Sequence, residues 1–478
     1  QAASVAVWLS ISYQAGFGNR AASRGWASRA DRLVDDTDGS ALAGWVLLAR
    51  ACGASSPASG EPLASRAVEL GTRLGDADLE LCALSQLGWW QVALGRIEEG
   101  FAHLDEAVAA SSGSEAVDLF TAVFTSCTML VAAARCGDVV RAFEWLRATE
   151  RFVRSQGGPY LVAHCRSAHG AVLLATGKWE EAEGELRRAI QASEGGTCPP
   201  VHAEALGILA QLWVHQGRVE EAAQLLGEPH DETQTVFARG LLRLARGESE
   251  HAASGLARRL HQPSTPVVEA ALVLGLLVEA HLAQGNLLQA REAGERLHAI
   301  ACLTTREVDW ARAALALGRI DRAGGDEDKA QRHLTVALDA FSHLGLPLER
   351  EQARRELARA MAVDDPKVAI AEATLALAGF DALGARGEAD ATAAFIRHIG
   401  GRARTGPRGP GGLTRRELQV LELLGVGLSN PDIAQRLYIG RKTVEHHVGN
   451  ILSKLGLGGR AEVAAYVART SGARRAQK

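Results

Sequence analysis

A short stretch near the C-terminal end, TVEHHVGN (Thr443–Asn450), combines an acidic residue with two adjacent histidines. A carboxylate and two imidazoles are groups that bind metal ions or transfer protons. In a helix, however, consecutive residues such as His446 and His447 point about 100° apart, so they do not converge on one ion as residues four apart would. No cysteine follows Cys302. We therefore predict no metal site in this stretch.

The rest of the chain offers no better catalytic or cofactor site. The seven cysteines are widely scattered and contain no C-x-x-C pair, which predicts reduced thiols and not disulfides or a zinc ribbon. The Gly-Lys pair at Gly177 lacks the spacing and the following Ser or Thr of a phosphate-binding loop. We predict no catalytic residue, no metal, no cofactor and no enzymatic activity.

Charge is distributed unevenly along the 478 residues. Residues 401–478 carry 14 Lys and Arg against 5 Asp and Glu, a net charge of +9, which leaves −13 for residues 1–400. A basic module on an acidic body indicates a polyanionic partner such as nucleic acid. The chain has no apolar run of membrane-spanning length and no secretory signal pattern, so we predict a cytoplasmic protein without membrane contact.

Residues 1 to 400 contain a loose internal repeat. Glycines spaced 30 to 42 residues apart each precede a polar residue and an Ala-bearing helical segment: Gly18, Gly60, Gly95, Gly137, Gly177, Gly217, Gly247, Gly285 and Gly325. Asp365 begins a similar segment without the glycine. A glycine at such a point adopts the left-handed conformation that ends a helix and turns the chain back. Small residues seven apart, such as Ala182 and Ala189, lie on one helix face and admit a neighbouring helix. The pattern predicts stacked helical hairpins.

These segments resemble tetratricopeptide repeats, in the irregular form found in MalT-like and other large LuxR-family regulators. The resemblance implies a superhelix with a concave inner face, and such faces bind proteins or small effectors. An irregular all-helical bundle is the alternative. Alternating β-branched runs are absent, so we expect negligible sheet content.

A change of composition marks a domain boundary after the repeats. Residues 400–412, GGRARTGPRGPGG, are too rich in glycine and proline to form a helix. We therefore predict a repeat domain at residues 1–399, a flexible basic linker at 400–412, a C-terminal module at 413–470 and a basic tail at 471–478.

The C-terminal module begins with two short helices. Thr414, with Glu417 three residues later, has the pattern of a capping box for a first helix that ends near Leu424. Ser429 or Asn430 caps the second helix, because a proline and an aspartate follow in its first turn. The sequence YIG then predicts a tight turn.

A longer helix follows from about Arg441 to Leu455, and a last helix from about Arg460 to Arg469. The longer helix carries a single apolar stripe with spacings of four, three and four residues, formed by Val444, Val448, Ile451 and Leu455. The tight turn joins the second short helix to this longer helix, and two helices joined in this way are typical of a helix-turn-helix.

The segments LTRRE, VLELL, GLSNPDIAQRL, TVEHHVGNI and KLGL resemble the LuxR-type DNA-binding domain along its whole length. The resemblance implies that the helix from Arg441 enters the major groove of double-stranded DNA. By the resemblance, the base-facing residues are Glu445, His446 and Gly449, and the phosphate-facing residues are Arg441, Lys442, Thr443, Asn450, Lys454 and Arg460. The helical period agrees with this division, because positions 445, 446 and 449 lie opposite the apolar stripe.

Three positions depart from the family pattern. Gly440 stands where a capping Ser is usual, at a cost of only a few tenths of a kcal/mol, so the helix should still begin there. Gly449 costs about 1 kcal/mol inside a helix and leaves the groove-facing surface bare. Glu445 replaces a common Lys. It either accepts a hydrogen bond from a cytosine amino group or forms a helical ion pair with Arg441.

Together these features predict an all-α protein, with a superhelical array of tetratricopeptide-like hairpins followed by a small four-helix LuxR-type domain. We predict a DNA-binding transcription regulator whose repeat domain senses an unidentified protein or small-molecule effector and whose recognition helix (441–455) reads the major groove. A homodimer is expected, because one short helix reads few base pairs. The alternatives are a helical-repeat interaction scaffold and the C-terminal part of a larger ATPase-containing regulator.

Overall fold

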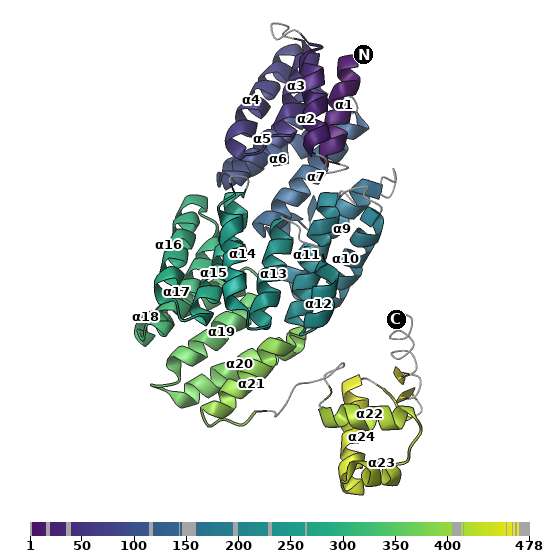
Figure 1. The fold of residues 1–478 in the computed structure, drawn as a ribbon, viewed down its shortest axis with the longest axis vertical. Helices are drawn as coiled ribbons and strands as arrows, with labels where there is room; N and C mark the ends of the chain where they lie inside the picture. Colours follow the sequence, from purple (N-terminus) through teal and green to yellow (C-terminus); the bar gives the residue numbers. More distant parts are fainter. Residues whose placement is uncertain are drawn as a thin grey trace. The chain divides into compact units, whose positions relative to one another are not determined.

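The computed structural model describes residues 2–15, 20–34, 40–113, 118–142, 144–145, 159–194, 199–227, 232–262, 265–403, 413, 415–455, 457–460, 462–463 and 466–467. The regular elements among them are helices, and no β-strand occurs in this part of the chain (Figure 1). This confirms the all-α prediction. The chain divides into two compact units, Gln1–Glu372 and Ala373–Lys478.

The first unit is an array of antiparallel helices. Its helices are α1 (Ala2–Ala15), α2 (Arg20–Asp31), α3 (Ala41–Cys52), α4 (Pro57–Leu74), α5 (Ala77–Ala93), α6 (Ile97–Gly113), α7 (Leu119–Cys136), α9 (Pro159–Ala175), α10 (Trp179–Ser193), α11 (Pro199–His215), α12 (Val219–Leu226), α13 (Thr233–Ala245), α14 (Ser249–Leu260), α15 (Val267–Ala283), α16 (Leu287–Thr304), α17 (Glu307–Ala323), α18 (Glu327–His343) and α19 (Pro347–Met361). Each of these helices packs on its neighbour in the chain, and each odd-numbered helix also packs on the next odd-numbered one. The result is the predicted row of stacked hairpins.

Most of the repeat glycines end helices as predicted. The backbone is left-handed, with φ between 68° and 91°, at Gly95, Gly137, Gly177, Gly217, Gly247, Gly285 and Gly325. Gly18 lies outside the described residues. The prediction is wrong for Gly60, which lies inside α4, where an added Cβ would be 2.3 Å from the Trp90 ring. Gly60 therefore serves close packing, and the left-handed turn comes instead at Gly75 (φ 68°).

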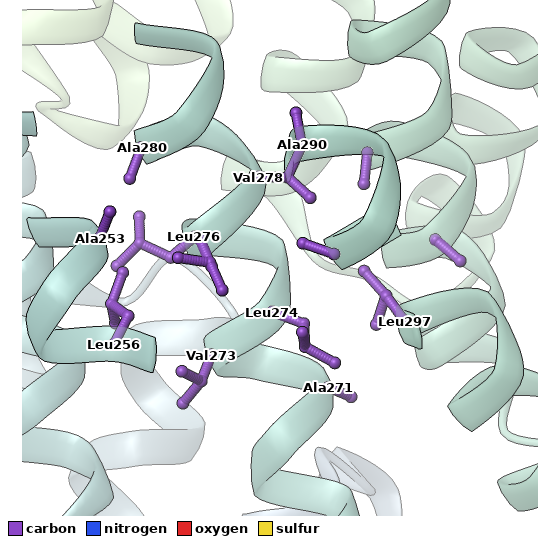
Figure 2. Close-up of a cluster of buried hydrophobic side chains, with 14 of the residues drawn as sticks. Ala253, Leu256, Ala271, Val273, Leu274, Leu276, Val278, Ala280, Ala290 and Leu297 are labelled. Carbon is purple, nitrogen blue, oxygen red and sulfur yellow. The ribbon is translucent and has the colours of Figure 1, made fainter. Parts of the chain in front are cut away.

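Small residues let the helices approach one another. The predicted pair Ala182 and Ala189 on α10 is completely buried, and so are Ala330 and Ala337, which lie seven apart on α18. Figure 2 shows the same principle at α14–α16, where alanines lie among larger side chains such as Leu256, Leu274 and Leu297. The core of the array is thus built from contacts between successive hairpins.

The array also folds back on itself. Helix α15 contacts both α5 and α7, which are far from it in the sequence. Val268 of α15 belongs to the same apolar cluster as Val92 of α5. Arg306 Nη1, just before α17, donates to the carbonyl of Cys136, the last residue of α7, at 2.6 Å. Odd-numbered helices from two distant parts of the array therefore pack together at this place.

The second unit contains α21 (Arg386–His398), α22 (Arg415–Gly425), α23 (Asn430–Leu437) and α24 (Arg441–Leu455), whereas α20 (Pro366–Leu383) spans the division. Residues 404–412 of the predicted linker lie outside the described residues, and our domain boundaries at 399 and 413 stay a prediction. None of the described helices combines the length and the apolar character that crossing a bilayer requires.

Candidate nucleic-acid interface

Helix α23 begins at a capping box. Asp432 N donates to Ser429 Oγ at 3.4 Å, and Ser429 N donates to Asp432 Oδ2 at 3.2 Å. The two otherwise unpaired amides at the helix start are satisfied in this way, and the proline in the first turn has no N–H group and needs no acceptor. Of the two predicted caps, Ser429 is the correct one.

The turn between α23 and α24 is tight. Tyr438 ends α23 in the left-handed conformation, with φ 54° and ψ 48°. Val444 N donates to the Gly440 carbonyl at 3.1 Å, so α24 begins at Arg441 as predicted despite the missing cap side chain. Arg416 Nη2 on α22 donates to the Leu437 carbonyl and ties the end of α23 to the first helix.

The apolar stripe of α24 holds the helix in the domain. Val444 and Ile451 are completely buried, and Val448 and Leu455 are partly buried. They share one cluster with residues from α22 and α23, namely Val420, Leu421, Leu424, Ile433 and Ala434. Because this side of α24 faces the core, the other side is presented outward.

The three predicted base-facing residues, Glu445, His446 and Gly449, are exposed. A Cβ built on Gly449 would meet no other atom within 4 Å, so the surface at this point is open. The predicted phosphate-facing residues Arg441, Lys442 and Thr443 are also exposed, whereas Asn450 is partly buried. The exposed face therefore begins with two cations at the N-terminal end of α24.

Glu445 forms the helical ion pair that the sequence left open. Arg441 Nε donates to Glu445 Oε1 at 3.0 Å, one helical turn apart, with 70% and 46% of the two side chains exposed. Pairs of this kind contribute about 0.3–0.5 kcal/mol, because both charges stay hydrated. Such a pair forms readily and also exchanges partners readily.

Lys454 has an internal partner. Its Nζ donates to both carboxylate oxygens of Glu417 on α22, at 2.8 and 2.6 Å. Only 3% of the Glu417 side chain is exposed, against 30% of the Lys454 side chain. Thr414, the other member of the predicted capping box, lies outside the described residues. A buried carboxylate thus neutralises part of the charge that we expected to face phosphate.

Arg460 is likewise attached to the domain. Its Nη1 donates to Asn430 Oδ1 at 2.8 Å, and its Nη2 donates to the Leu428 carbonyl. Residues 460, 462–463 and 466–467 are helical, and the other positions of the predicted last helix lie outside the described residues. Arg460 therefore connects this last segment to the start of α23.

The two histidines occupy different surroundings. Their ring centroids are 6.5 Å apart and the rings are inclined by 53°. His446 is exposed, whereas Nδ1 of His447 is buried and has no hydrogen-bond partner among the described residues. Burial lowers the pKa of His447, against the opposing effect of nearby Glu417, so its imidazole is neutral at pH 7. No group of three potential metal ligands occurs in the described part of the chain.

Two further exposed residues adjoin this surface and were missed by sequence reasoning. Tyr438 is 95% exposed in the turn, and Arg436 is exposed in the last turn of α23. A large aromatic residue inside a predicted tight turn indicates an exposed side chain, and this signal could have identified Tyr438. The buried role of Glu417 had no such signal, since its partner lies 37 positions away.

Comparison with known proteins agrees with this geometry. Residues 412–467 match the family described as bacterial regulatory proteins, luxR family. Residues 412–467 form a LuxR-family domain. Helix α23, the tight turn after it and α24 have the order of a helix-turn-helix, in which α24 is the second helix.

Curated relatives match this LuxR-family domain and not the whole chain. The chain is 51% identical over 57 residues to the transcriptional regulatory protein LnrK of Bacillus subtilis, a match that covers 12% of this chain and 26% of LnrK. It is 46% identical over 57 residues to the transcriptional regulatory protein LiaR of the same organism, covering 12% of this chain and 27% of LiaR. The chain thus spans about a quarter of the length of these relatives.

Solved structures resemble a longer part of the chain at low identity. A Rap protein complexed with competence and sporulation factor matches with 12% identity and a TM-score of 0.43, covering 67% of this chain and 98% of that one. The apo form of the quorum sensor NprR from B. thuringiensis matches with 13% identity and a TM-score of 0.43, covering 70% of this chain and 97% of that one.

Proposed function

We propose that this protein binds double-stranded DNA through α24 and regulates transcription. The observation that supports this most directly is the division of α24 into two faces. Val444 and Ile451 anchor one face in the LuxR-family domain, and Arg441, Glu445 and His446 are exposed on the rest of the helix. In helix-turn-helix proteins, the second helix lies in the major groove and its N-terminal residues contact base edges.

We propose base-facing roles for Glu445, His446 and Gly449, all of them on the exposed face. The residues proposed to contact phosphates are Arg441, Lys442, Thr443, Asn450, Lys454 and Arg460. Their internal partners divide this set into two kinds. Lys442 is exposed at the start of α24, so its whole charge is available to a phosphate. Lys454 and Arg460 are oriented by their internal hydrogen bonds and reach phosphate only with their remaining donors.

The proposal also covers the rest of the chain. The repeat domain at 1–399 senses a protein or small-molecule effector, and the linker at 400–412 connects it to the domain at 413–470. The protein is a cytoplasmic homodimer, since two recognition helices double the length of DNA that is read. The contacts of α15 with α5 and with α7 limit where an effector can bind without disturbing the array. An effector that enters between these helices must displace that contact, whereas one that binds elsewhere leaves it intact.

The test measures binding of the full chain to a library of genomic DNA fragments at two salt concentrations. We expect binding that weakens steeply as salt rises. Lys442→Ala should weaken binding to all sequences alike and reduce the slope of log K against log salt by about 0.9, the effect of one lost phosphate contact. Lys367→Ala removes an exposed lysine of α20 and serves as the matched control.

A chain that binds no DNA fragment at either salt concentration would contradict the proposed function. Equal effects of Lys442→Ala and Lys367→Ala would show that binding depends only on total charge and not on α24.

A further inference from the structure

The ion pair on α24 leaves the outer edge of an arginine available. Arg441 uses Nε to donate to Glu445 Oε1 at 3.0 Å. Neither Nη1 nor Nη2 of Arg441 has a hydrogen-bond partner among the residues that the structure describes, and the side chain is 70% exposed. The guanidinium is therefore held on one side and presents two donors on the other.

Arg441 is also well placed along the helix. It is the first residue of α24, at the end that contacts base edges in helix-turn-helix proteins. Positions 441, 445 and 449 follow one another at one-turn intervals, and all three residues are exposed. At the third position Gly449 has no side chain, and the space around it is open. The 441–445–449 ridge therefore offers Glu445 a cationic partner on one side only.

We propose that Arg441 reads a guanine and that Glu445 is the positioning residue that aims it. Two parallel N–H groups of an arginine match the O6 and N7 acceptors of guanine, the commonest specific contact in the major groove. The Glu445 carboxylate limits the rotation of the guanidinium, and Arg441 offsets the repulsion between that carboxylate and the phosphates. This inference rests on the proposed DNA-binding function. It assigns base reading to Arg441 in place of the phosphate contact proposed above. It also makes Glu445 a residue that orients Arg441 and does not itself contact a base.

The experiment begins with selection of preferred duplexes from a random library by the full chain. Each guanine of the selected duplex is then replaced in turn by 7-deazaguanine, which removes the N7 acceptor and leaves every phosphate unchanged. We expect one position per half-site at which this replacement weakens wild-type binding about tenfold, the size of a lost major-groove base contact. At that position the Arg441→Ala variant should bind both duplexes equally.

Two other variants separate aiming from direct contact. Glu445→Gln keeps an acceptor for Arg441 Nε, so it should retain the sensitivity to 7-deazaguanine, whereas Glu445→Ala should lose most of it. Lys442→Ala is the matched control at the next position. It should weaken binding to normal and modified duplexes by the same factor, as a phosphate contact does.

The possible results are distinguishable. If the wild-type chain binds no DNA, the proposed function fails and this inference falls with it. If the chain binds DNA but Arg441→Ala keeps the sensitivity to the same guanine, or only lowers the salt slope, Arg441 does not read that base and this inference alone is overturned. Equal behaviour of Glu445→Gln and Glu445→Ala would overturn the positioning role.

Discussion

Two acidic residues in different regions, Glu269 in the repeat array and Glu445 in the LuxR-family domain, show how burial decides what an ion pair does. Glu269 lies on α15 and 9% of its side chain is exposed. It pairs with Arg135 of α7 at 3.1 Å and with Arg259 of α14 at 3.5 Å, and it accepts a hydrogen bond from Thr233. This carboxylate joins helices that are distant in the sequence.

Arg135 extends the network around Glu269. It also pairs with Glu204 of α11 at 3.4 Å, and its guanidinium lies 5.1 Å from the centre of the Trp89 ring. Removing Glu269 would leave Arg259, with only 10% of its side chain exposed, without a carboxylate, which costs far more than the pair contributes. The network is therefore structural, and its charges are not available to a ligand.

The pair between Arg441 and Glu445 has the opposite properties. Both side chains are largely hydrated, so separating them costs little. A DNA phosphate or base is able to replace one partner without leaving a buried charge. Lys454 and Glu417 lie between these extremes, because only the acid is buried. The comparison teaches that burial of the carboxylate, and not the presence of a pair, separates structural charges from binding charges.

The largest expected effect is in the repeat array. Glu269→Ala should destabilise the array by about 3 kcal/mol, because Arg135 and Arg259 lose their shared carboxylate. All nine tryptophans lie between residues 8 and 310, so denaturant unfolding of the full chain followed by tryptophan fluorescence reports on this region. Glu295→Ala, at an exposed position of α16, is the control and should change stability by less than about 0.5 kcal/mol. Equal effects of the two substitutions would refute the structural role of Glu269.

A smaller effect is expected in the LuxR-family domain. Lys454→Ala should destabilise it by about 2 kcal/mol, because the buried Glu417 carboxylate loses its cation. Amide hydrogen exchange of α22–α24 measures this locally, and Lys442→Ala should leave the exchange unchanged. Adding Glu417→Leu to Lys454→Ala should restore most of the stability, since no buried charge remains. A double variant less stable than Lys454→Ala alone would contradict this explanation.

The smallest effect has the opposite sign. Gly449→Ala should stabilise α24 by about 1 kcal/mol, because the added methyl group meets no other atom and alanine favours the helix. Slower amide exchange in α24 would be the observed result. Gly425→Ala is the matched substitution in α22. It should destabilise the domain, because its Cβ would lie 2.7 Å from Val467 Cγ1. Destabilisation by Gly449→Ala would contradict the open surface at this position, because it would mean that the added methyl group meets another part of the chain.

Features that depend on residues close in the sequence were predictable from the sequence. The bounds of α24, its apolar stripe and the capping serine of α23 all follow from spacings of three or four residues. Seven repeat glycines have the left-handed conformation that was expected of them. The exposure of Glu445, His446 and Gly449 also follows from the helical period, because the opposite side of the same helix is apolar.

Features that depend on distant partners were decided by the tertiary structure. Gly60 has the same local pattern as the turn glycines, yet it lies inside α4, where the ring of the distant residue Trp90 packs closely against it. The burial of Glu417 and its ion pair with Lys454, 37 positions later, had no signal in the local spacing. Burial and ion pairing are set by which helices pack together, and no local spacing encodes that choice. The sequence determined where the helices begin and which faces are apolar, and packing decided which charges remain free to bind.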